Sequence, residues 1–205
     1  MNGVVLFTQR VEVVESYGER RDCADQRIAE FINSCGYIPV PVPNQAQIVT
    51  NLVETIHPVG IVLTGGNSLL KYGGNAPERD ETDFTLIDLA IKKMIPLYGF
   101  CRGMQSILDY FDCPLENVEG HVAVRHVISG LDAMVEVNSY HNQACKTMTT
   151  SKLEIVMKTE DGVIEKIRHK TLPIVGTMWH PEREKHFTEY DMNLVKKLFN
   201  NKFNR

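Results

Sequence analysis

Short apolar runs alternate with segments of helical periodicity over the first half of the chain. Four nearly continuous apolar runs predict strands that are buried on both faces of a sheet: residues 4–7, 37–40, 60–63 and 95–100. Four segments whose apolar residues recur every three or four positions predict amphipathic helices: residues 22–35, 45–56, 84–95 and 104–111. Strands that alternate with helices indicate βαβ units and a parallel sheet.

The pattern changes after about residue 120. Four short runs with β character follow: residues 121–127, 134–138, 153–158 and 163–169. Glu160-Asp161-Gly162 supplies a hairpin turn between the last two runs. A further strand at residues 173–179 and a closing helix at residues 191–199 complete the pattern. The C-terminal half is therefore expected to add antiparallel strands to the sheet.

Composition narrows the class of protein. The chain has 205 residues, and at roughly 150 residues per domain this predicts a single domain over residues 1–205. The 22 basic and 26 acidic residues give a net charge of −4, which provides no basic surface for nucleic acid. No apolar stretch approaches the roughly 18 residues of a membrane span, and the N-terminus lacks the basic region of a signal peptide. Five scattered cysteines without a CxxC pair fit the reduced cytoplasm.

One cysteine has the surroundings of a nucleophile. Gly99-Phe100-Cys101-Arg102-Gly103 spans the junction of a predicted strand and a predicted helix. A sharp turn there would project the Cys101 side chain above the sheet edge, and glycines on either side fit the crowded backbone. The helix N-terminus favours the thiolate, and the Arg102 backbone N–H would face a developing oxyanion. The alternative is a small cysteine packed after a strand.

Two further segments could complete this chemistry. Trp179-His180-Pro181-Glu182 follows the strand at residues 173–179, where His180 could act as a base on Cys101 and Glu182 could orient its ring. The alternative is an ordinary solvated His-Pro loop. Thr64-Gly65-Gly66 follows a buried strand, and the Gly66 N–H is a second candidate oxyanion donor.

Four segments together resemble the class I glutamine amidotransferase superfamily over nearly the whole chain. They are Leu63-Thr64-Gly65-Gly66, Gly99-Phe100-Cys101-Arg102-Gly103-Met104-Gln105, Val137-Asn138-Ser139-Tyr140-His141-Asn142-Gln143 and Trp179-His180-Pro181-Glu182. Cys-Arg-Gly-x-Gln, Pro77-Glu78-Arg79-Asp80 and Asp83 resemble the gamma-glutamyl hydrolase branch, which includes gamma-glutamyl-gamma-aminobutyrate hydrolases. The resemblance implies an α/β fold: a flavodoxin-like three-layer sandwich with a mostly parallel central sheet, helices on both faces and a small antiparallel β-section in the C-terminal half.

The resemblance also implies a site and a reaction. The enzyme would be a hydrolase of gamma-glutamyl amides, working through a thioester on Cys101 with His180 as base and acid and Glu182 as the orienting carboxylate. The Gly66 and Arg102 amides would form the oxyanion hole. Four residues would lie near the glutamyl group: Gln105, Ser139, Tyr140 and His141. No metal or organic cofactor is implied, and the partner is a small-molecule substrate.

Two departures from the family pattern concern the pocket for the leaving group. Asn67 follows the glycines where many members have a proline beside them, and His141-Asn142-Gln143 stands where the hydrolase branch often has two histidines. One subfamily acts on gamma-glutamyl-CDP-amidate in capsule phosphoramidate synthesis, and the short chain with its altered pocket makes this a candidate substrate.

Other functions stay open at this stage. One is a glutaminase subunit that passes ammonia to a separate synthase chain. Another is a redox sensor or binding module that reuses Cys101, although such a protein would not need the His180 and Glu182 pair. Cys113, His121 and His126 follow no known zinc spacing, so we expect no metal there. The sequence assigns no role to Cys145.

Overall fold

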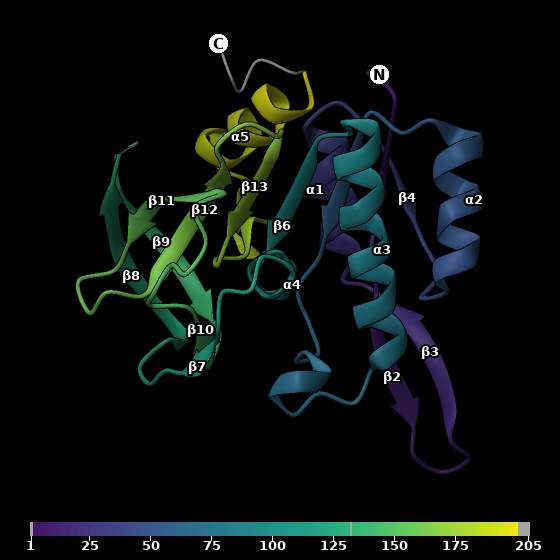
Figure 1. Cartoon of the computed structure of the whole chain (residues 1–205), viewed down its shortest axis with the longest axis horizontal. Coiled ribbons are helices and arrows are strands. Elements are labelled where there is room, and N and C mark those ends of the chain that lie inside the picture. The colour runs from purple at the N-terminus through teal and green to yellow at the C-terminus, as the bar shows by residue number, and fades with distance from the viewer. Residues whose placement is uncertain (1, 132, 201–205) are drawn as a thin grey trace.

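The computed structural model describes residues 2–131 and 133–200, so the ends of the predicted 1–205 domain lie outside the described residues. Its centre is a nine-stranded sheet within these residues (Figure 1). Five neighbouring strands are parallel: β4 (Ile38–Pro41), β1 (Val4–Phe7), β5 (Gly60–Leu63), β6 (Leu97–Phe100) and β13 (Ile174–Thr177). Numbered along the chain, they follow the order 2-1-3-4-5, which is that of flavodoxin-like folds. The predicted α/β class is confirmed.

The sheet continues beyond β13 with antiparallel strands. In order outward these are β12 (Ile164–His169), β11 (Leu153–Lys158), β8 (Val122–Gly130) and β9 (Met134–Tyr140). The turn at Glu160-Asp161-Gly162 joins β11 to β12 as predicted. A separate two-stranded sheet pairs β7 (Glu116–Asn117) with β10 (Gln143–Ala144). The antiparallel half lies on the left in Figure 1.

Helices cover both faces of the parallel half. Three helices pack on one face: α2 (Ala46–Ile56), α3 (Pro77–Lys93) and α4 (Arg102–Tyr110). Two helices pack on the other: α1 (Gln26–Ser34) and α5 (Glu189–Phe199). Successive strand residues supply the two cores alternately, since Leu6 lies in the first and its neighbours Val5 and Phe7 lie in the second. This burial on both faces explains the continuous apolar runs.

The N-terminal region differs from the sequence prediction. A hairpin of β2 (Arg10–Val14) and β3 (Glu19–Cys23) projects at the lower right of Figure 1. It occupies the first residues of the helix predicted at 22–35, which starts only at Gln26. The side chain of Asp25 accepts a hydrogen bond from the Arg27 amide and caps α1. The two remaining helical turns are 3₁₀: η1 (Leu70–Tyr72) and η2 (Pro181–Arg183).

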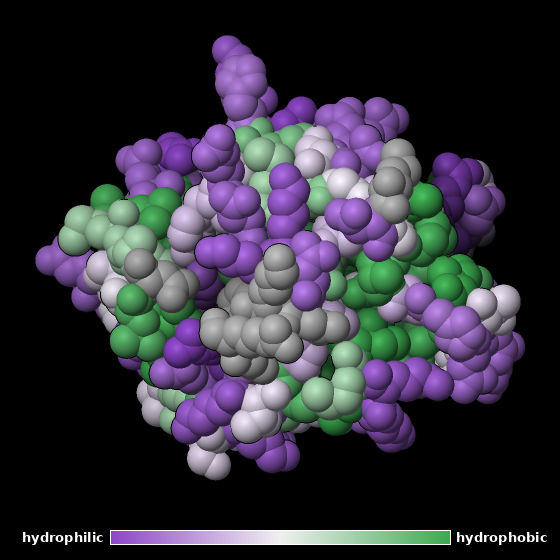
Figure 2. Space-filling model, turned by 90° about the horizontal axis from the view of Figure 1, so that it is seen from above, coloured by the Kyte–Doolittle hydropathy of each residue, from purple (hydrophilic) through white to green (hydrophobic). Residues whose placement is uncertain are grey.

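Hydrophilic and hydrophobic side chains are interspersed over the face of the molecule shown in Figure 2. None of the helices in the described part of the chain combines the length and the apolar character needed to cross a membrane.

Candidate active site

Cys101 stands at the tight turn between β6 and α4. Its backbone adopts φ 50° and ψ −112°, a conformation that residues other than glycine rarely take and that clusters at functional sites. The Cys101 amide donates to the carbonyl of Thr177 on β13 (2.8 Å), which fixes the turn to the neighbouring strand. The side chain is 8% exposed. The turn predicted from the sequence is therefore formed and strained.

The glycines around Cys101 are required by packing. A Cβ at Gly99 would lie 2.7 Å from the backbone of Gly103. A Cβ at Gly103 would lie 2.0 Å from the carbonyl oxygen of Leu63 on β5. Because neither position carries a side chain, α4 can approach the sheet closely and present its N-terminus at Cys101. The first amides of a helix have no partner within the helix, so those at the start of α4 are available to an anion.

His180 lies at the end of β13, directly before η2, and is buried. Its Nδ1 is 2.7 Å from Oε1 of Glu182, and its ring lines the same pocket as Cys101. Burial acts to lower the pKa of His180, but Cys101 and Glu182 outweigh it and raise this pKa to about 10. The ring is therefore held as an imidazolium at neutral pH, the form that stabilises a neighbouring thiolate. The structure brings together the three residues predicted as a triad.

Contacts from distant segments hold His180 in place. Asn138 on β9 accepts a hydrogen bond from the His180 amide (2.9 Å) and donates to the His180 carbonyl (2.8 Å). Arg27 on α1 donates to the carbonyls of Glu182 (2.8 Å) and Glu184 (2.7 Å). Neither Asn138 nor Arg27 was singled out from the sequence for this role, because the contacts join segments far apart in the chain. Both residues position the His180 segment without lining the pocket at Cys101.

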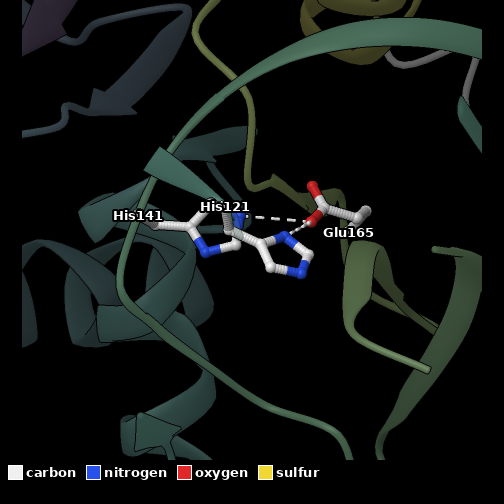
Figure 3. Close-up of side chains that lie close together, drawn as sticks. All are labelled: His121, His141 and Glu165. Carbon is white, nitrogen blue, oxygen red and sulfur yellow. Dashed lines mark hydrogen bonds and ion pairs between the residues drawn. The ribbon is translucent and has the colours of Figure 1, made fainter. Parts of the chain in front are cut away.

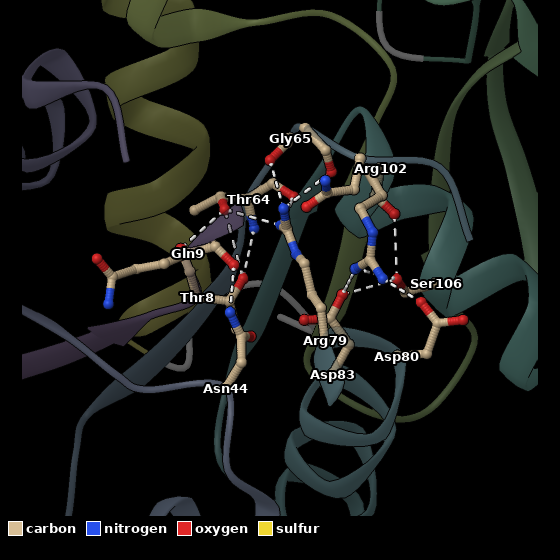
Figure 4. Close-up of polar contacts among 12 residues, drawn as sticks. Thr8, Gln9, Asn44, Thr64, Gly65, Arg79, Asp80, Asp83, Arg102 and Ser106 are labelled. Atoms are coloured by element: carbon tan, nitrogen blue, oxygen red, sulfur yellow. Dashed lines mark hydrogen bonds and ion pairs between the residues drawn. The ribbon is translucent and has the colours of Figure 1, made fainter. Parts of the chain in front are cut away.

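Arg79 on α3 organises the predicted oxyanion loop. Its guanidinium donates to three successive carbonyls, those of Thr64 (2.7 Å), Gly65 (3.0 Å) and Gly66 (2.8 Å) (Figure 4). In a trans peptide the carbonyl and the following N–H point in opposite directions. With the Gly65 carbonyl held by Arg79, the Gly66 N–H is turned away from Arg79. Burial, together with the neighbouring Arg102, lowers the pKa of Arg79 to about 9, so it stays charged at neutral pH.

The Arg102 side chain has a different role from its backbone. It is buried and forms ion pairs with Asp80 (2.5 Å) and with Asp83 on α3. Ser106 donates to the same Asp83 oxygen (2.8 Å). Figure 4 shows Arg79 and Arg102 side by side, directed to different partners. These ion pairs fix the first turn of α4 to α3. They thereby position the Arg102 backbone amide, which the sequence predicts as an oxyanion donor.

A pocket of about 210 Å³ lies over Cys101. Most of the sequence-predicted residues line it: Gly66, Cys101, Arg102, Gln105, Tyr140, His141 and His180. Arg183, which was not predicted, also lines it and stacks on the Tyr140 ring (4.3 Å). Glu182 is not in this lining and contacts His180 from outside the pocket.

The predicted substrate-contact residues differ in how they are held. Gln105 on α4 donates to the Gln143 carbonyl (2.9 Å), and Tyr140 is 41% exposed at the pocket. His141 is buried, with Nε2 at 3.1 Å from Glu165. Ser139 is also buried, lies outside the pocket lining and donates to the His121 carbonyl (2.6 Å). Ser139 therefore contacts the wall of the site.

The other cysteines have surroundings unlike those of Cys101. Burial raises the pKa of Cys35 to about 12 and that of Cys145 to about 11. Cys113 is buried beside the sulfur of Met148 (3.4 Å). The thiols of Cys35 and Cys145 therefore stay protonated at neutral pH, and all three cysteines pack as small apolar groups.

Comparison with known proteins identifies the family. The family model for glutamine amidotransferase class-I matches residues 21–201. The chain belongs to the class-I glutamine amidotransferase family. It is 30% identical over 185 residues to the gamma-glutamyl-CDP-amidate hydrolase of Campylobacter jejuni, covering 87% of this chain and 89% of the relative. It is 26% identical over 221 residues to the gamma-glutamyl-gamma-aminobutyrate hydrolase of Escherichia coli O157:H7, covering 88% and 84%.

The family's fold is matched by solved structures. A candidate GMP synthase subunit from Thermoplasma acidophilum aligns with a TM-score of 0.71 at 18% identity, covering 97% of this chain and 93% of the other. At this identity the likeness supports the fold alone. The relatives with the hydrolase names support amide hydrolysis as the class of reaction.

Proposed function

We propose that this glutamine amidotransferase homologue is a free-standing hydrolase that cleaves a gamma-glutamyl amide through a thioester on Cys101. The observation that carries the proposal is the pairing of Cys101, in its strained turn, with a buried His180 that is held as an imidazolium by Glu182. This arrangement supplies a nucleophile, a proton donor and an orienting carboxylate at one pocket.

The first half-reaction acylates the cysteine. The Cys101 thiolate attacks the gamma-carbonyl carbon, and the carbonyl oxygen takes the negative charge beside the amides of Gly66 and Arg102. His180 then gives its proton to the leaving nitrogen as the C–N bond breaks. The products of this step are the free amine or amidate and a gamma-glutamyl thioester on Cys101.

The second half-reaction releases glutamate. Neutral His180 takes a proton from a water molecule, whose oxygen attacks the thioester carbonyl. Collapse of the tetrahedral intermediate breaks the C–S bond and returns the thiolate beside the imidazolium. The steps use only this chain's own residues and water. Gln105, Tyr140 and His141 line the pocket where the glutamyl group would lie, with Ser139 packed behind them.

We further propose gamma-glutamyl-CDP-amidate as the substrate. The support is the 30% identity to a relative of that name over most of both chains. The pocket edge adds a chemical reason, because Arg183 and the half-exposed Tyr140 ring lie together there. A guanidinium binds phosphate oxygens and an aromatic ring stacks on a base, so both fit a nucleotide leaving group better than a simple amine.

A substrate panel tests the leaving group. The purified protein alone is given gamma-glutamyl-CDP-amidate, gamma-glutamyl-gamma-aminobutyrate and glutamine at equal concentrations, and glutamate release is followed. We expect the CDP-amidate to be cleaved with the highest kcat/KM, and R183A to lower that value about tenfold or more while changing glutamine hydrolysis little. A higher kcat/KM for gamma-glutamyl-gamma-aminobutyrate would contradict the substrate but keep the reaction class.

Hydroxylamine tests the thioester in the same assay. If one gamma-glutamyl thioester forms from every substrate, the ratio of hydroxamate to glutamate is the same for all of them. A ratio that varies with the leaving group would contradict a common intermediate. Activity that appears only when a synthase chain is added would favour the alternative, a glutaminase subunit that delivers ammonia.

A further inference from the structure

Three histidines converge on one buried carboxylate beside the active-site pocket. The Oε1 atom of Glu165, on β12, lies 3.1 Å from Nε2 of His141, 3.5 Å from Nε2 of His126 and 3.7 Å from Nδ1 of His121. Glu165 is fully buried, as is nearly all of His121 and His141. Figure 3 shows the rings of His121 and His141 turned toward the Glu165 carboxylate. None of these contacts takes part in the proposed chemistry.

Irregular backbone places two of the histidines on the same side of β8. His126 stands five positions after His121, and in a regular strand this odd spacing puts side chains on opposite faces. The pairing of β8 with β9 shifts by one residue between Val122 and Val124, and Ala123 takes φ 56°. This bulge brings the rings of His121 and His126 to 5.0 Å between centroids.

Hydrogen bonding leaves several buried polar atoms of the cluster without partners. Among the described residues, His121 Nδ1, His126 Nε2 and Glu165 Oε2 are buried atoms with no hydrogen-bond partner. His121 Nε2 lies 3.1 Å from Asp161 Oδ2. If Nε2 carries the proton toward Asp161, Nδ1 presents a lone pair to Glu165 Oε1, so two acceptors face each other.

The distances fit two ligands that share a cation. Two ligands of one tetrahedral Zn²⁺, each bonded at about 2.0–2.1 Å, lie roughly 3.3 Å apart. The three nitrogens lie 3.1–3.7 Å from Glu165 Oε1, and the ligand atoms of His121, His141 and Glu165 all lie within 4.8 Å of one another. Asp161 contacts the far nitrogen of His121 as a carboxylate does behind a zinc-bound histidine.

We propose that His121 Nδ1, His141 Nε2 and Glu165 Oε1 form a binding site for Zn²⁺. Imidazole nitrogens with one carboxylate are a donor set that suits this cation. Zinc binding at this site leaves the proposed hydrolysis mechanism unchanged, and the two proposals are tested independently. Sequence spacing did not reveal it, because the ligands come from three segments and Cys113 is not among them.

Bound zinc would stabilise the wall of the active site. His141 lines the pocket over Cys101, and the Glu165 carbonyl accepts a hydrogen bond from the amide of Met178 (2.8 Å), two residues before His180. A cation that joins His141 to Glu165 therefore holds the pocket wall to the strand next to the catalytic histidine. Because the folded state provides the site, Zn²⁺ binding should raise the melting temperature.

Equilibrium dialysis against Zn²⁺ tests the site. The measurement uses the full chain carrying C101A, so that zinc cannot bind the active-site thiolate, and counts bound metal per chain. We expect one equivalent for C101A and for the control C101A/H186A, which lacks an exposed histidine away from the cluster. C101A/H121A should bind more than tenfold more weakly, and C101A/D161N about 10–100-fold more weakly.

The D161N variant still tests the site if the variant with the buried H121A substitution does not fold. The Asp161 side chain is 49% exposed, so its replacement by asparagine leaves the buried cluster intact. Thermal unfolding with Zn²⁺ and with a chelator supplies a second measurement, in which C101A should gain stability and C101A/D161N should gain less. The proposal is overturned if C101A binds less than half an equivalent, or if C101A/D161N binds as tightly as C101A.

Discussion

At the scale of single residues, the candidate site depends on two neighbours that stabilise the charged form of His180. Cys101 is forced into a strained backbone conformation at the start of α4. His180 is buried beside the same pocket, with its Nδ1 at Glu182. Burial alone would lower the pKa of His180, so the imidazolium depends on Cys101 and Glu182 beside the ring.

Titration of the His180 ring tests whether Cys101 and Glu182 stabilise its charged form. The raised pKa of about 10 means that the pair stabilises the fold fully below the unfolded value of about 6.5 and loses that contribution as pH rises through 10. Nitrogen NMR of the imidazole should show the ring still protonated at pH 8. C101A removes one of the groups that raise the pKa, so the ring should titrate at lower pH.

E182Q should lower the pKa of His180 as well, because it removes the carboxylate that helps to raise this pKa. H186A serves as the control, since this exposed ring should leave the His180 signal unchanged. A wild-type His180 that titrates near 6.5, or a pKa that does not move in C101A, would contradict the ion pair.

Residues that act within one motif could be predicted from the sequence, whereas positioning residues could not. Cys101, His180 and Glu182 stand in short segments whose local pattern carries the chemistry. Asn138 holds His180 although the two residues lie 42 positions apart in the chain. Nothing in the sequence distinguishes Asn138 from the other asparagines for this role. Arg79 was noticed only as part of a family segment, and its three carbonyl contacts required the structure.

At the scale of elements, the close approach of α4 to β5 and β6 creates the nucleophile turn. Gly103 faces the carbonyl of Leu63 so tightly that no side chain fits. The contact brings the free amides at the start of α4 to the edge of the sheet. The loop that contains Gly66 follows β5 at the same edge. Tight helix-to-sheet packing is therefore part of the geometry of the proposed nucleophile turn.

The G103A variant tests this packing. Its Cβ would lie 2.0 Å from a backbone oxygen that cannot rotate away, so α4 must shift. We expect a loss of about 3 kcal/mol in the free energy of unfolding, measured with denaturant, and a fall in kcat of about 100-fold. G162A is the control, because nothing lies near its Cβ and only its positive φ of 88° is strained.

The control should cost about 1 kcal/mol and leave kcat unchanged. Equal kcat values for G103A and G162A would show that the approach of α4 to β5 does not set the position of Cys101.

Elements with strong periodicity were predicted, and those shaped by surface contacts were not. The buried parallel strands and the helices between them follow from their apolar patterns. The β2–β3 hairpin escaped prediction because most of its residues are exposed and β3 is strongly charged. The bulge at Ala123 also has no sequence signal, since alanine seldom takes a positive φ.

At the scale of the whole molecule, the active site joins the two halves of one sheet. The parallel half supplies Cys101 and Gly66 at the ends of neighbouring strands, as expected for a flavodoxin-like fold. The antiparallel half supplies Asn138, Tyr140 and His141. His180 follows β13, the strand where the two halves meet. The site thus requires segments from residue 66 to residue 182 in one folded unit.

The most direct test of the account is the rate of glutamate release from a gamma-glutamyl amide by the isolated chain, compared with that of C101A. We predict steady turnover without any partner chain and a fall of roughly 10³-fold or more in C101A, because the covalent route is lost. Circular dichroism would verify that the variant is folded. Turnover by folded C101A near that of the unmodified protein would contradict cysteine-dependent hydrolysis.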